Sequence, residues 1–393
     1  MRILMTGLDS IHTTRQVKWL LDRDCKVSLL SPVNPLPNEV NGRFQWISPI
    51  HPRGVGIYGK IPSRSLVNRL KEATRAVQHK ALFQKIKPQV IHANWIDGSV
   101  SNPSYYFAIT RCKPLVLNVW GTDVNQYFEP TDDGVRIDKR KRYRTAMALK
   151  HADAVIVDAA DMYEKCESLA QKSLRFEMMP LGIDTDHFRP MDVEVARRYR
   201  RKLKISDTAK VIVSIRATGR RYGHHYVLEA FARAVPKLHE EAVLVFRDYN
   251  APADDASIAE LKSRAEELGI LNRIRVVESV PYEQLREIYA LADLIVNYPV
   301  MDAFPVTFIE AAACCRRVVS CSLPAYRGTF AEQCFRMVKP EDSADLCEGL
   351  VDELNRSDSG EDERLTEIRR RIESEFSENV SAQKLISLYQ SFL

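Results

Sequence analysis

The feature that most constrains the fold of this chain is its alternation of short apolar runs with longer segments of helical periodicity. The alternation continues through almost all of the 393 residues and is typical of parallel β-sheets with crossover helices. A chain of this length exceeds the size at which a single hydrophobic core keeps growing, so we expect two domains of roughly 180 to 200 residues. The predicted fold class is α/β, with two doubly wound parallel sheets.

Each half of the chain contains enough predicted strands for one sheet. The strands expected in the first sheet are Arg2–Thr6, Lys26–Leu30, Gln89–Ala93, Leu115–Val119 and Ala154–Val157, with helices such as Arg15–Leu21 and Leu66–Phe83 between them. The strands expected in the second sheet are Val211–Ile215, Val243–Phe246, Ile274–Val277, Leu294–Asn297 and Val318–Cys321. Two helices, Leu365–Phe376 and Asn379–Phe392, are expected after them.

A cluster of turn-forming residues interrupts the alternation at residues 179–192, MPLGIDTDHFRPMD. We place the linker there, with an N-terminal domain over residues 1–185 and a second domain over residues 186–375. Two short helices cannot form a domain alone. We therefore expect residues 376–393 to form a C-terminal helix that packs back on the N-terminal domain.

Composition limits the environment and the partners of the chain. It is 45% hydrophobic and 28% charged, as in ordinary soluble proteins, with no signal-peptide pattern and no apolar stretch of about 18 residues. The eight cysteines form no CxxC pair and have no interleaved histidines, so we expect reduced core residues rather than disulfides or a zinc site. A cytoplasmic location is predicted.

The net charge of +5 is modest but unevenly distributed. Six basic residues fall within nine positions, and they are Arg136, Lys139, Arg140, Lys141, Arg142 and Arg144. The stretch fits either peripheral contact with anionic lipid at the inner face of a membrane or a solvated helix face. Nucleic-acid binding is not expected, because the charge is mild and no basic-aromatic module is present.

The residues that carry chemistry are expected in the loops after the strands, because ligands of open parallel sheets bind outside the carboxyl ends. In the segment 297–310, NYPVMDAFPVTFIE, Pro305 suits a first helical turn. The free N–H groups of Val306 and Thr307 would then form an anion site fit for a diphosphate.

Two acidic residues flank that helix start. Asp302 lies on the preceding loop and Glu310 more than one turn into the helix, separated by on the order of 10 Å. This suits the two ends of one nucleotide sugar and is too wide for a hydrolytic carboxylate pair, which lies about 5 to 9.5 Å apart. By spacing alone, Asp302 would equally be a turn residue and Glu310 an exposed helix acid.

A basic loop after the strand Val211–Ile215 favours the functional interpretation. It carries Arg216, Arg220 and Arg221, and guanidinium groups bind phosphate in a bidentate fashion without a metal ion. A solvated basic loop is the alternative, which fits Arg220 better than Arg216 because Arg216 directly follows an apolar strand.

The loops of the first half carry weaker signals. Gly7 stands alone where a dinucleotide fingerprint needs three glycines, which weakens an NAD-binding interpretation. A single glycine would still allow the backbone to approach a ligand closely. His12 and His92 also lie at predicted strand ends, where they would contact an acceptor or act only as structural hydrogen-bonding residues.

The segment DAFPVTFIEA resembles the signature of family 4 retaining glycosyltransferases with the GT-B fold, in which seven residues separate two acidic residues. MPLGIDTDHFRP is similar to the inter-domain segment of that family, SIRATGRRYGHHYVLEAFARA to its donor-phosphate loop and following helix, and VWGTD to its first-domain cleft loop. The resemblance covers nearly the whole chain and implies two Rossmann-like domains facing across a cleft.

The resemblance implies a retaining, metal-independent glycosyltransferase that moves a sugar from a nucleotide-diphosphate sugar to a glycan precursor, a lipid-linked acceptor or a small molecule. Glu310 would bind the ribose, Asp302 the hydroxyls of the transferred sugar, and Arg216 with Arg221 the diphosphate. The backbone from Phe304 to Thr307 would complete the donor site. The leaving phosphate would help to deprotonate the acceptor on the same face, so neither a cofactor nor a dedicated base is expected.

The sequence departs from the family pattern at three places. Asp302 stands where glutamate is commoner, and the usual lysine of the phosphate loop is replaced by Arg221 or Arg220. Trp120 stands where many members have a histidine, so it would offer a stacking surface with Asp123 as a nearby polar contact.

Two alternatives stay open. One is a binding protein that keeps the donor site without turnover. The other is a GT-B epimerase or phosphorylase-like enzyme, which would need its own acid and base residues. The donor nucleotide, the acceptor and the oligomeric state do not follow from the sequence.

Overall fold

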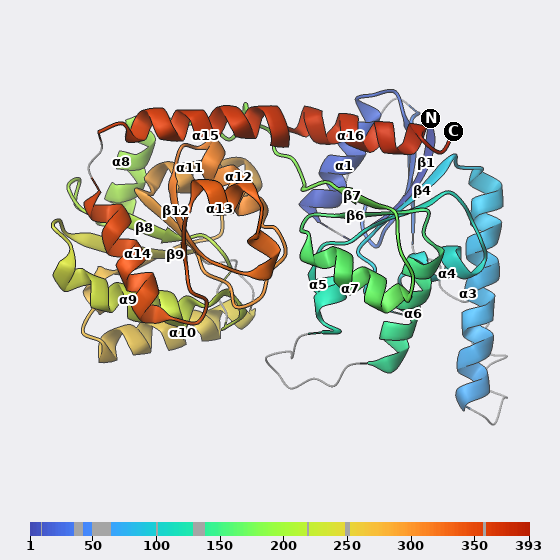
Figure 1. The fold of residues 1–393 in the computed structure, drawn as a ribbon, viewed down its shortest axis with the longest axis horizontal. Helices are drawn as coiled ribbons and strands as arrows, with labels where there is room; N and C mark the ends of the chain where they lie inside the picture. Colours follow the sequence, from blue (N-terminus) through green and yellow to red (C-terminus); the bar gives the residue numbers. More distant parts are fainter. Residues whose placement is uncertain are drawn as a thin grey trace. The chain divides into compact units, whose positions relative to one another are not determined.

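The computed structural model describes residues 1–8, 10–34, 42–48, 64–99, 101–128, 138–217, 220–247, 252–356 and 359–393. Internal contacts divide the chain into two compact units (Figure 1). The first unit comprises Met1–Leu181 together with Ser381–Leu393, and the second comprises Gly182–Val380. The division after Leu181 lies within the turn-rich segment 179–192.

The first unit is built on a seven-stranded parallel sheet with the order β3-β2-β1-β4-β5-β6-β7. Its strands are β1 Arg2–Thr6, β2 Lys26–Leu30, β3 Phe44–Ile47, β4 Val90–Asn94, β5 Leu115–Asn118, β6 Ala154–Val157 and β7 Phe176–Met178. Its helices are α1 Ile11–Leu21, α3 Arg64–Ile86, α4 Pro103–Ile109, α5 Thr122–Asn125, α6 Lys139–His151, α7 Asp161–Ala170 and most of α16 Glu378–Gln390. Strands β1 and β4 are neighbours, and Ile3 pairs with Val90.

The second unit contains a six-stranded parallel sheet with the order β10-β9-β8-β11-β12-β13. Its strands are β8 Lys210–Ser214, β9 Ala242–Arg247, β10 Ile274–Val277, β11 Leu294–Asn297, β12 Arg317–Cys321 and β13 Arg336–Val338. Its helices are α8 Val193–Lys202, α9 His224–Ala234, α10 Pro252–Glu267, α11 Leu285–Leu291, α12 Val306–Ala313, α13 Phe330–Cys334, α14 Ser343–Asn355 and α15 Glu361–Phe376. Figure 1 shows these helices packed around the sheet.

The predicted α/β class with two parallel sheets is confirmed, and the ten predicted strands are present with ends that differ by one residue at most. Three strands, β3, β7 and β13, were not predicted. All three lie at the edges of their sheets and are only partly buried, so their sequences lack the continuous apolar run of a central strand.

Helix α16 completes the core of the first unit. Leu385, Leu388 and Tyr389 belong to the same buried cluster as Ile3 and Val116 of the central strands. The unit is therefore assembled from two segments of the chain that the whole second unit separates.

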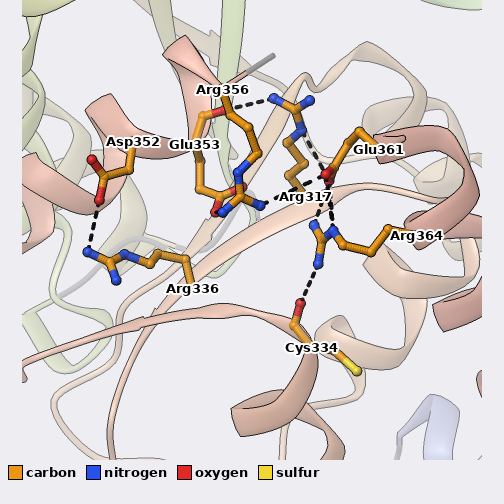
Figure 2. Close-up of polar contacts among 8 residues, drawn as sticks. All are labelled: Arg317, Cys334, Arg336, Asp352, Glu353, Arg356, Glu361 and Arg364. Carbon is orange, nitrogen blue, oxygen red and sulfur yellow. Dashed lines mark hydrogen bonds and ion pairs between the residues drawn. The ribbon is translucent and has the colours of Figure 1, made fainter. Parts of the chain in front are cut away.

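A cluster of arginine and glutamate side chains fixes the start of helix α15 in the second unit (Figure 2). Glu361 is 6% exposed, and its carboxylate pairs with Arg364, with Arg317 of β12 at 3.3 Å and with Arg356 at 3.9 Å. Burial alone would raise the pKa of Glu361, but the hydrogen bond from Arg364 and the three guanidinium charges lower it. Arg364 also donates to the Cys334 carbonyl, which ties α15 to α13.

Most of the cysteines lie in the cores of the two units. All eight are free, and six of them are buried, namely Cys25, Cys112, Cys166, Cys314, Cys321 and Cys347. Within the part of the chain that the structure describes, no helix is both long and apolar enough to cross a membrane.

Candidate functional site

The candidate site of the second unit lies where strands β8 and β11 are neighbours. From β8 the chain continues to β9 on one side, and from β11 it continues to β12 on the other, so the two loops diverge at the carboxyl edge. Such a switch point is where open α/β sheets bind ligands. The loop after β8 carries Arg216 and Arg221, and the loop after β11 carries Asp302.

The two loops are held against each other by their backbones. The Val300 N–H donates to the Arg221 carbonyl at 2.8 Å. Gly223 has φ +64°, and a Cβ there would lie 2.1 Å from the Tyr298 carbonyl oxygen, so only glycine fits. His224 connects the loop after β8 to the strand itself. Its Nε2 lies 2.6 Å from the Ala217 carbonyl of the loop, and its Nδ1 lies 2.9 Å from the Ser214 hydroxyl of β8.

Arg216 and Asp302 form a bidentate ion pair. Nη1 of Arg216 donates to Oδ2 at 2.9 Å and Nη2 donates to Oδ1 at 3.2 Å. The side chains are 16% and 13% exposed, so the pair is largely withdrawn from water. The guanidinium lies over the Tyr222 ring, 4.6 Å from its centroid.

Tyr326 is a third member of this cluster. Its hydroxyl donates to Oδ2 of Asp302 at 3.0 Å, and the residue is 1% exposed. Burial and the Asp302 charge raise the pKa of Tyr326 well above its ordinary value, so the hydroxyl remains a donor. Tyr326 was not predicted from the sequence, because it lies on a third loop, after β12, where no motif singles it out.

The N-terminus of helix α12 faces the same edge of the sheet. Pro305 is the cap residue, with ψ 133°, rather than a member of the first turn, and among the described residues no side-chain hydrogen bond caps the helix. The first helical residues are Val306 and Thr307, as the anion-site prediction requires. The Thr307 hydroxyl is buried without a hydrogen-bond partner among the described residues.

Glu310 projects from α12 into a buried environment. It is 3% exposed, and its Oε2 accepts a hydrogen bond of 2.7 Å from the Tyr289 hydroxyl of α11. The alternative interpretation of an exposed helix acid is therefore wrong. Phe304, on the loop before the helix, is 5% exposed and packs against Phe308 and Phe330.

Asn297, the last residue of β11, was also missed by the sequence analysis. It is 1% exposed, and in the described part of the chain neither Oδ1 nor Nδ2 has a hydrogen-bond partner. A polar residue at the end of an otherwise apolar strand is the only signal that points to it, and that signal is weak.

The first unit has a pocket of about 310 Å³ at the carboxyl ends of β1, β2 and β4. Its lining includes Gly7, Asn94, Trp95, Asp97 and Asn102. A Cβ on Gly7 would lie 2.6 Å from the Thr13 side chain, so glycine is needed for this turn. The pocket offers amide and carboxylate groups beside an indole ring.

An aromatic cluster is formed by residues of the same sheet edge. Trp120 is partly exposed, and its ring makes edge contacts with His12 at 5.6 Å and with Trp95 at 6.1 Å between centroids. Burial, with a smaller effect of the Arg15 charge, lowers the pKa of His12 to about 4. His12 is therefore neutral at pH 7, and its Nδ1 has no partner among the described residues.

Two residues that the sequence placed in the acceptor region are instead structural. His92 is 0% exposed, and its two ring nitrogens lie 2.9 Å from Asn94 Oδ1 and 2.6 Å from the Tyr389 hydroxyl. Asp123 is 0% exposed and accepts the N–H groups of Ile96 at 3.0 Å and Trp120 at 3.1 Å. Both lie near strand ends, as predicted, but the His92 side chain contacts β4 and α16, and the Asp123 carboxylate supports the backbone of two loops.

The basic stretch forms the start of α6. Lys139, Arg140 and Arg142 are exposed, whereas Arg144 is buried and pairs with Glu72. Arg136 lies outside the described residues.

Comparison with known proteins finds a glycosyltransferase family match in each half of the chain. Residues 195–371 match the family of glycosyl transferases group 1, and residues 2–159 match the family described as glycosyl transferase 4-like. The second unit therefore matches the group 1 glycosyltransferases, and the first unit matches a second glycosyltransferase family. The acidic residues Asp302 and Glu310, together with Arg216 and Arg221, fall within the first of these matches.

The chain is similar to two D-inositol 3-phosphate glycosyltransferases. It is 25% identical over 272 residues to that of Corynebacterium urealyticum, covering 68% of this chain and 63% of the relative. It is 26% identical over 191 residues to that of Corynebacterium jeikeium, covering 48% and 46%. The chain thus spans less than two thirds of the length of these relatives.

Solved structures establish the GT-B fold. A glycosyltransferase from Rickettsia africae superposes with a TM-score of 0.78 at 14% identity, covering 100% of this chain and 98% of that one. Anabaena Alr3699/HepE, in complex with UDP and glucose, superposes with a TM-score of 0.74 at 13% identity, with both chains covered completely.

Proposed function

We propose that this glycosyltransferase transfers a sugar from a nucleotide-diphosphate sugar to a hydroxylated acceptor, with retention of the anomeric configuration and without a metal ion. The observation that carries the proposal is the convergence, at one switch point, of the uncapped α12 N-terminus, Arg216 and the buried Glu310. Anabaena HepE, which has the same fold, binds UDP and glucose.

The donor would be bound along this edge of the second unit. Glu310, fixed by Tyr289, would accept hydrogen bonds from the ribose hydroxyls. The N–H groups of Val306 and Thr307 would hold the diphosphate together with Arg216 and Arg221. Two guanidinium charges and a helix N-terminus supply the stabilisation that a divalent cation gives in other phosphate sites.

The chemical step would break the bond between the anomeric carbon and the diphosphate oxygen, while a bond forms from the acceptor oxygen to the same carbon. The acceptor proton would pass to the departing phosphate oxygen on the same face of the sugar. The step needs no protein base, and the arginines stabilise the charge that develops on the leaving diphosphate.

The acceptor would be bound by the pocket of the first unit. Its amide and carboxylate groups suit hydroxyl recognition, and Trp120 with Trp95 offers indole faces for a carbohydrate ring. The relatives act on D-inositol 3-phosphate, and a cyclic polyol of that kind is one acceptor to test. A cytoplasmic location, with peripheral contact through α6 at the membrane surface, belongs to the same proposal.

The proposal is tested first by a thermal-shift titration with UDP, GDP and ADP in the presence of EDTA, on the wild type and on Glu310→Gln. A ligand at 100 times its dissociation constant adds about 2.7 kcal/mol of stability. We expect a shift with one nucleotide that the variant loses. Donor turnover is then followed by NMR, which reports the anomeric configuration of the product. No shift with any nucleotide, or an inverted product, would overturn the proposal.

A second candidate is a nucleotide-sugar-binding protein without turnover. The observation that favours it is the ion pair with Arg216, which already occupies the Asp302 carboxylate. A thermal shift with no consumption of any donor sugar, with polyols and glycans tested as acceptors, would decide for this alternative.

A further inference from the structure

The hydrogen-bond capacity of Asp302 is already filled by the protein. A carboxylate has two oxygens with about two acceptor sites each. Oδ2 accepts from Arg216 Nη1 at 2.9 Å and from the Tyr326 hydroxyl at 3.0 Å. Oδ1 accepts from Arg216 Nη2 at 3.2 Å and from the Ala303 N–H at 3.1 Å. No acceptor site is left for the hydroxyl groups of a sugar.

The surroundings hold this arrangement from three loops. Arg216 follows β8, Asp302 follows β11, and Tyr326 follows β12, so the cluster joins three neighbouring strand ends. Tyr326 is 1% exposed and cannot turn its hydroxyl to solvent without leaving the core. Asp302 is therefore fixed on both of its oxygens.

Arg216 keeps donor capacity in this arrangement. A guanidinium has five N–H groups in a planar fork, and the ion pair uses two of them. The other three are not committed to Asp302. The Tyr222 ring at 4.6 Å lies against one face of the guanidinium and limits its rotation. The carboxylate and the ring together determine where these N–H groups point.

From this geometry, and on the basis of the proposed function, we infer that Asp302 is a positioning residue. It orients the Arg216 guanidinium for the donor diphosphate and does not bind the transferred sugar. This assignment replaces the role in sugar binding that the family resemblance implied for Asp302.

The test compares three ligands on the wild type and on Asp302→Asn by isothermal titration calorimetry. The ligands are UMP, UDP and UDP-glucose, or the guanosine or adenosine series if the thermal shift selects it. The ratio of UMP to UDP dissociation constants measures recognition of the second phosphate, and the ratio of UDP to UDP-glucose constants measures recognition of the sugar.

We expect the preference for UDP over UMP to fall by roughly two- to tenfold in Asp302→Asn, because a freed arginine side chain must be ordered on binding. The preference for UDP-glucose over UDP should stay unchanged within about twofold, since the sugar contacts are not affected. Tyr326→Phe, which removes one bond to Asp302 and leaves the ion pair, should give a smaller change of the same kind.

Three results would overturn the inference. A lost preference for UDP-glucose with an intact preference for UDP would make Asp302 a sugar ligand. Tighter UDP binding by Asp302→Asn would show that Asp302 only competes with the diphosphate for Arg216. A wild type that binds no nucleoside diphosphate would remove the proposed function and the inference together. If Asp302→Asn does not fold, the same ratios are read from Tyr326→Phe and Asp302→Glu.

Discussion

The Tyr289 hydroxyl donates a hydrogen bond of 2.7 Å to Glu310, so the carboxylate proposed to hold the ribose is fixed from the neighbouring helix α11. Tyr289→Phe should weaken nucleoside diphosphate binding by about tenfold and lower the free energy of unfolding by about 1 to 3 kcal/mol, because a buried hydrogen bond to a charged group is lost. Calorimetry and urea denaturation measure the two effects. Tyr143→Phe, at a residue that is 57% exposed, is the matched control and should change neither.

Gly223 should tolerate no side chain. Gly223→Ala places a Cβ 2.1 Å from the Tyr298 carbonyl in a residue with φ +64°, so we expect a loss of about 2 to 4 kcal/mol and weaker nucleotide binding. Gly328→Ala is the control, because φ is +70° there but nothing lies within 4 Å of the added Cβ. That variant should lose only about 1 kcal/mol and bind nucleotide normally. If urea denaturation gave equal losses of unfolding free energy for the two variants, the backbone would have moved to relieve the contact between the added Cβ and the Tyr298 carbonyl.

Stability should fall as the pH drops from 6.5 towards 4. Burial is the main cause that lowers the pKa of His12, His79 and His92 from 6.5 to about 4, so in this range the unfolded chain binds protons that the folded chain does not. The free energy of unfolding therefore rises with pH across this window. On acidification it decreases by up to roughly 3 kcal/mol per histidine.

Asp123 acts in the opposite sense over an overlapping window, since burial raises its pKa from 3.8 to about 7. The histidine effect is therefore best isolated with His79→Phe, which keeps an aromatic ring beside Tyr106 and Phe107. The variant should show a shallower increase in unfolding free energy between pH 4 and 6.5 than the wild type. An identical slope would contradict the assignment of a neutral, buried His79.

The cluster in Figure 2 should contribute far more to the free energy of unfolding than an exposed ion pair on the same helix. Glu361→Gln leaves Arg317, Arg356 and Arg364 without their shared carboxylate, and we expect a loss of about 3 kcal/mol in urea denaturation. Glu367→Gln is the control, because its pair with Arg370 is 71% and 67% exposed and should be worth less than about 1 kcal/mol. Similar losses of unfolding free energy in both variants would show that burial does not increase the stabilisation by these ion pairs.

Binding to anionic vesicles should depend on the exposed start of α6. Replacement of Lys139, Arg140 and Arg142 by glutamine should reduce co-sedimentation with phosphatidylglycerol vesicles by about tenfold or more, at about 1 kcal/mol per basic residue. The same change of charge at Arg197, Arg198 and Arg201 of α8 is the control. If both triple variants bind alike, net charge rather than the α6 surface determines binding.

The sequence predicted the central strands well because each combines a continuous apolar run with a position in the middle of a sheet. It was less informative about contacts between side chains on different loops and helices. Nothing local marks Tyr326 as the partner of Asp302, or Tyr289 as the partner of Glu310, since these pairs lie 24 and 21 residues apart on different elements.

The direction of a side chain was equally inaccessible from the sequence. His92 and Asp123 lie close to strand ends, where functional residues gather, and both were assigned to an acceptor. In the structure, His92 meets Tyr389, and Asp123 satisfies two backbone N–H groups. A position along a strand does not reveal whether a polar side chain turns inward to support the fold or outward to a ligand.

The packing of α16 in the first unit has a consequence for the order of events on the ribosome. Leu385 and Tyr389 are translated only after the second unit, Gly182–Val380, has been made. At about 5 to 20 residues per second, the nascent first sheet waits on the order of 10 to 40 s for the helix that completes its core. The second unit is continuous in sequence and needs no such delay, so it is the later-synthesised half that can finish folding first.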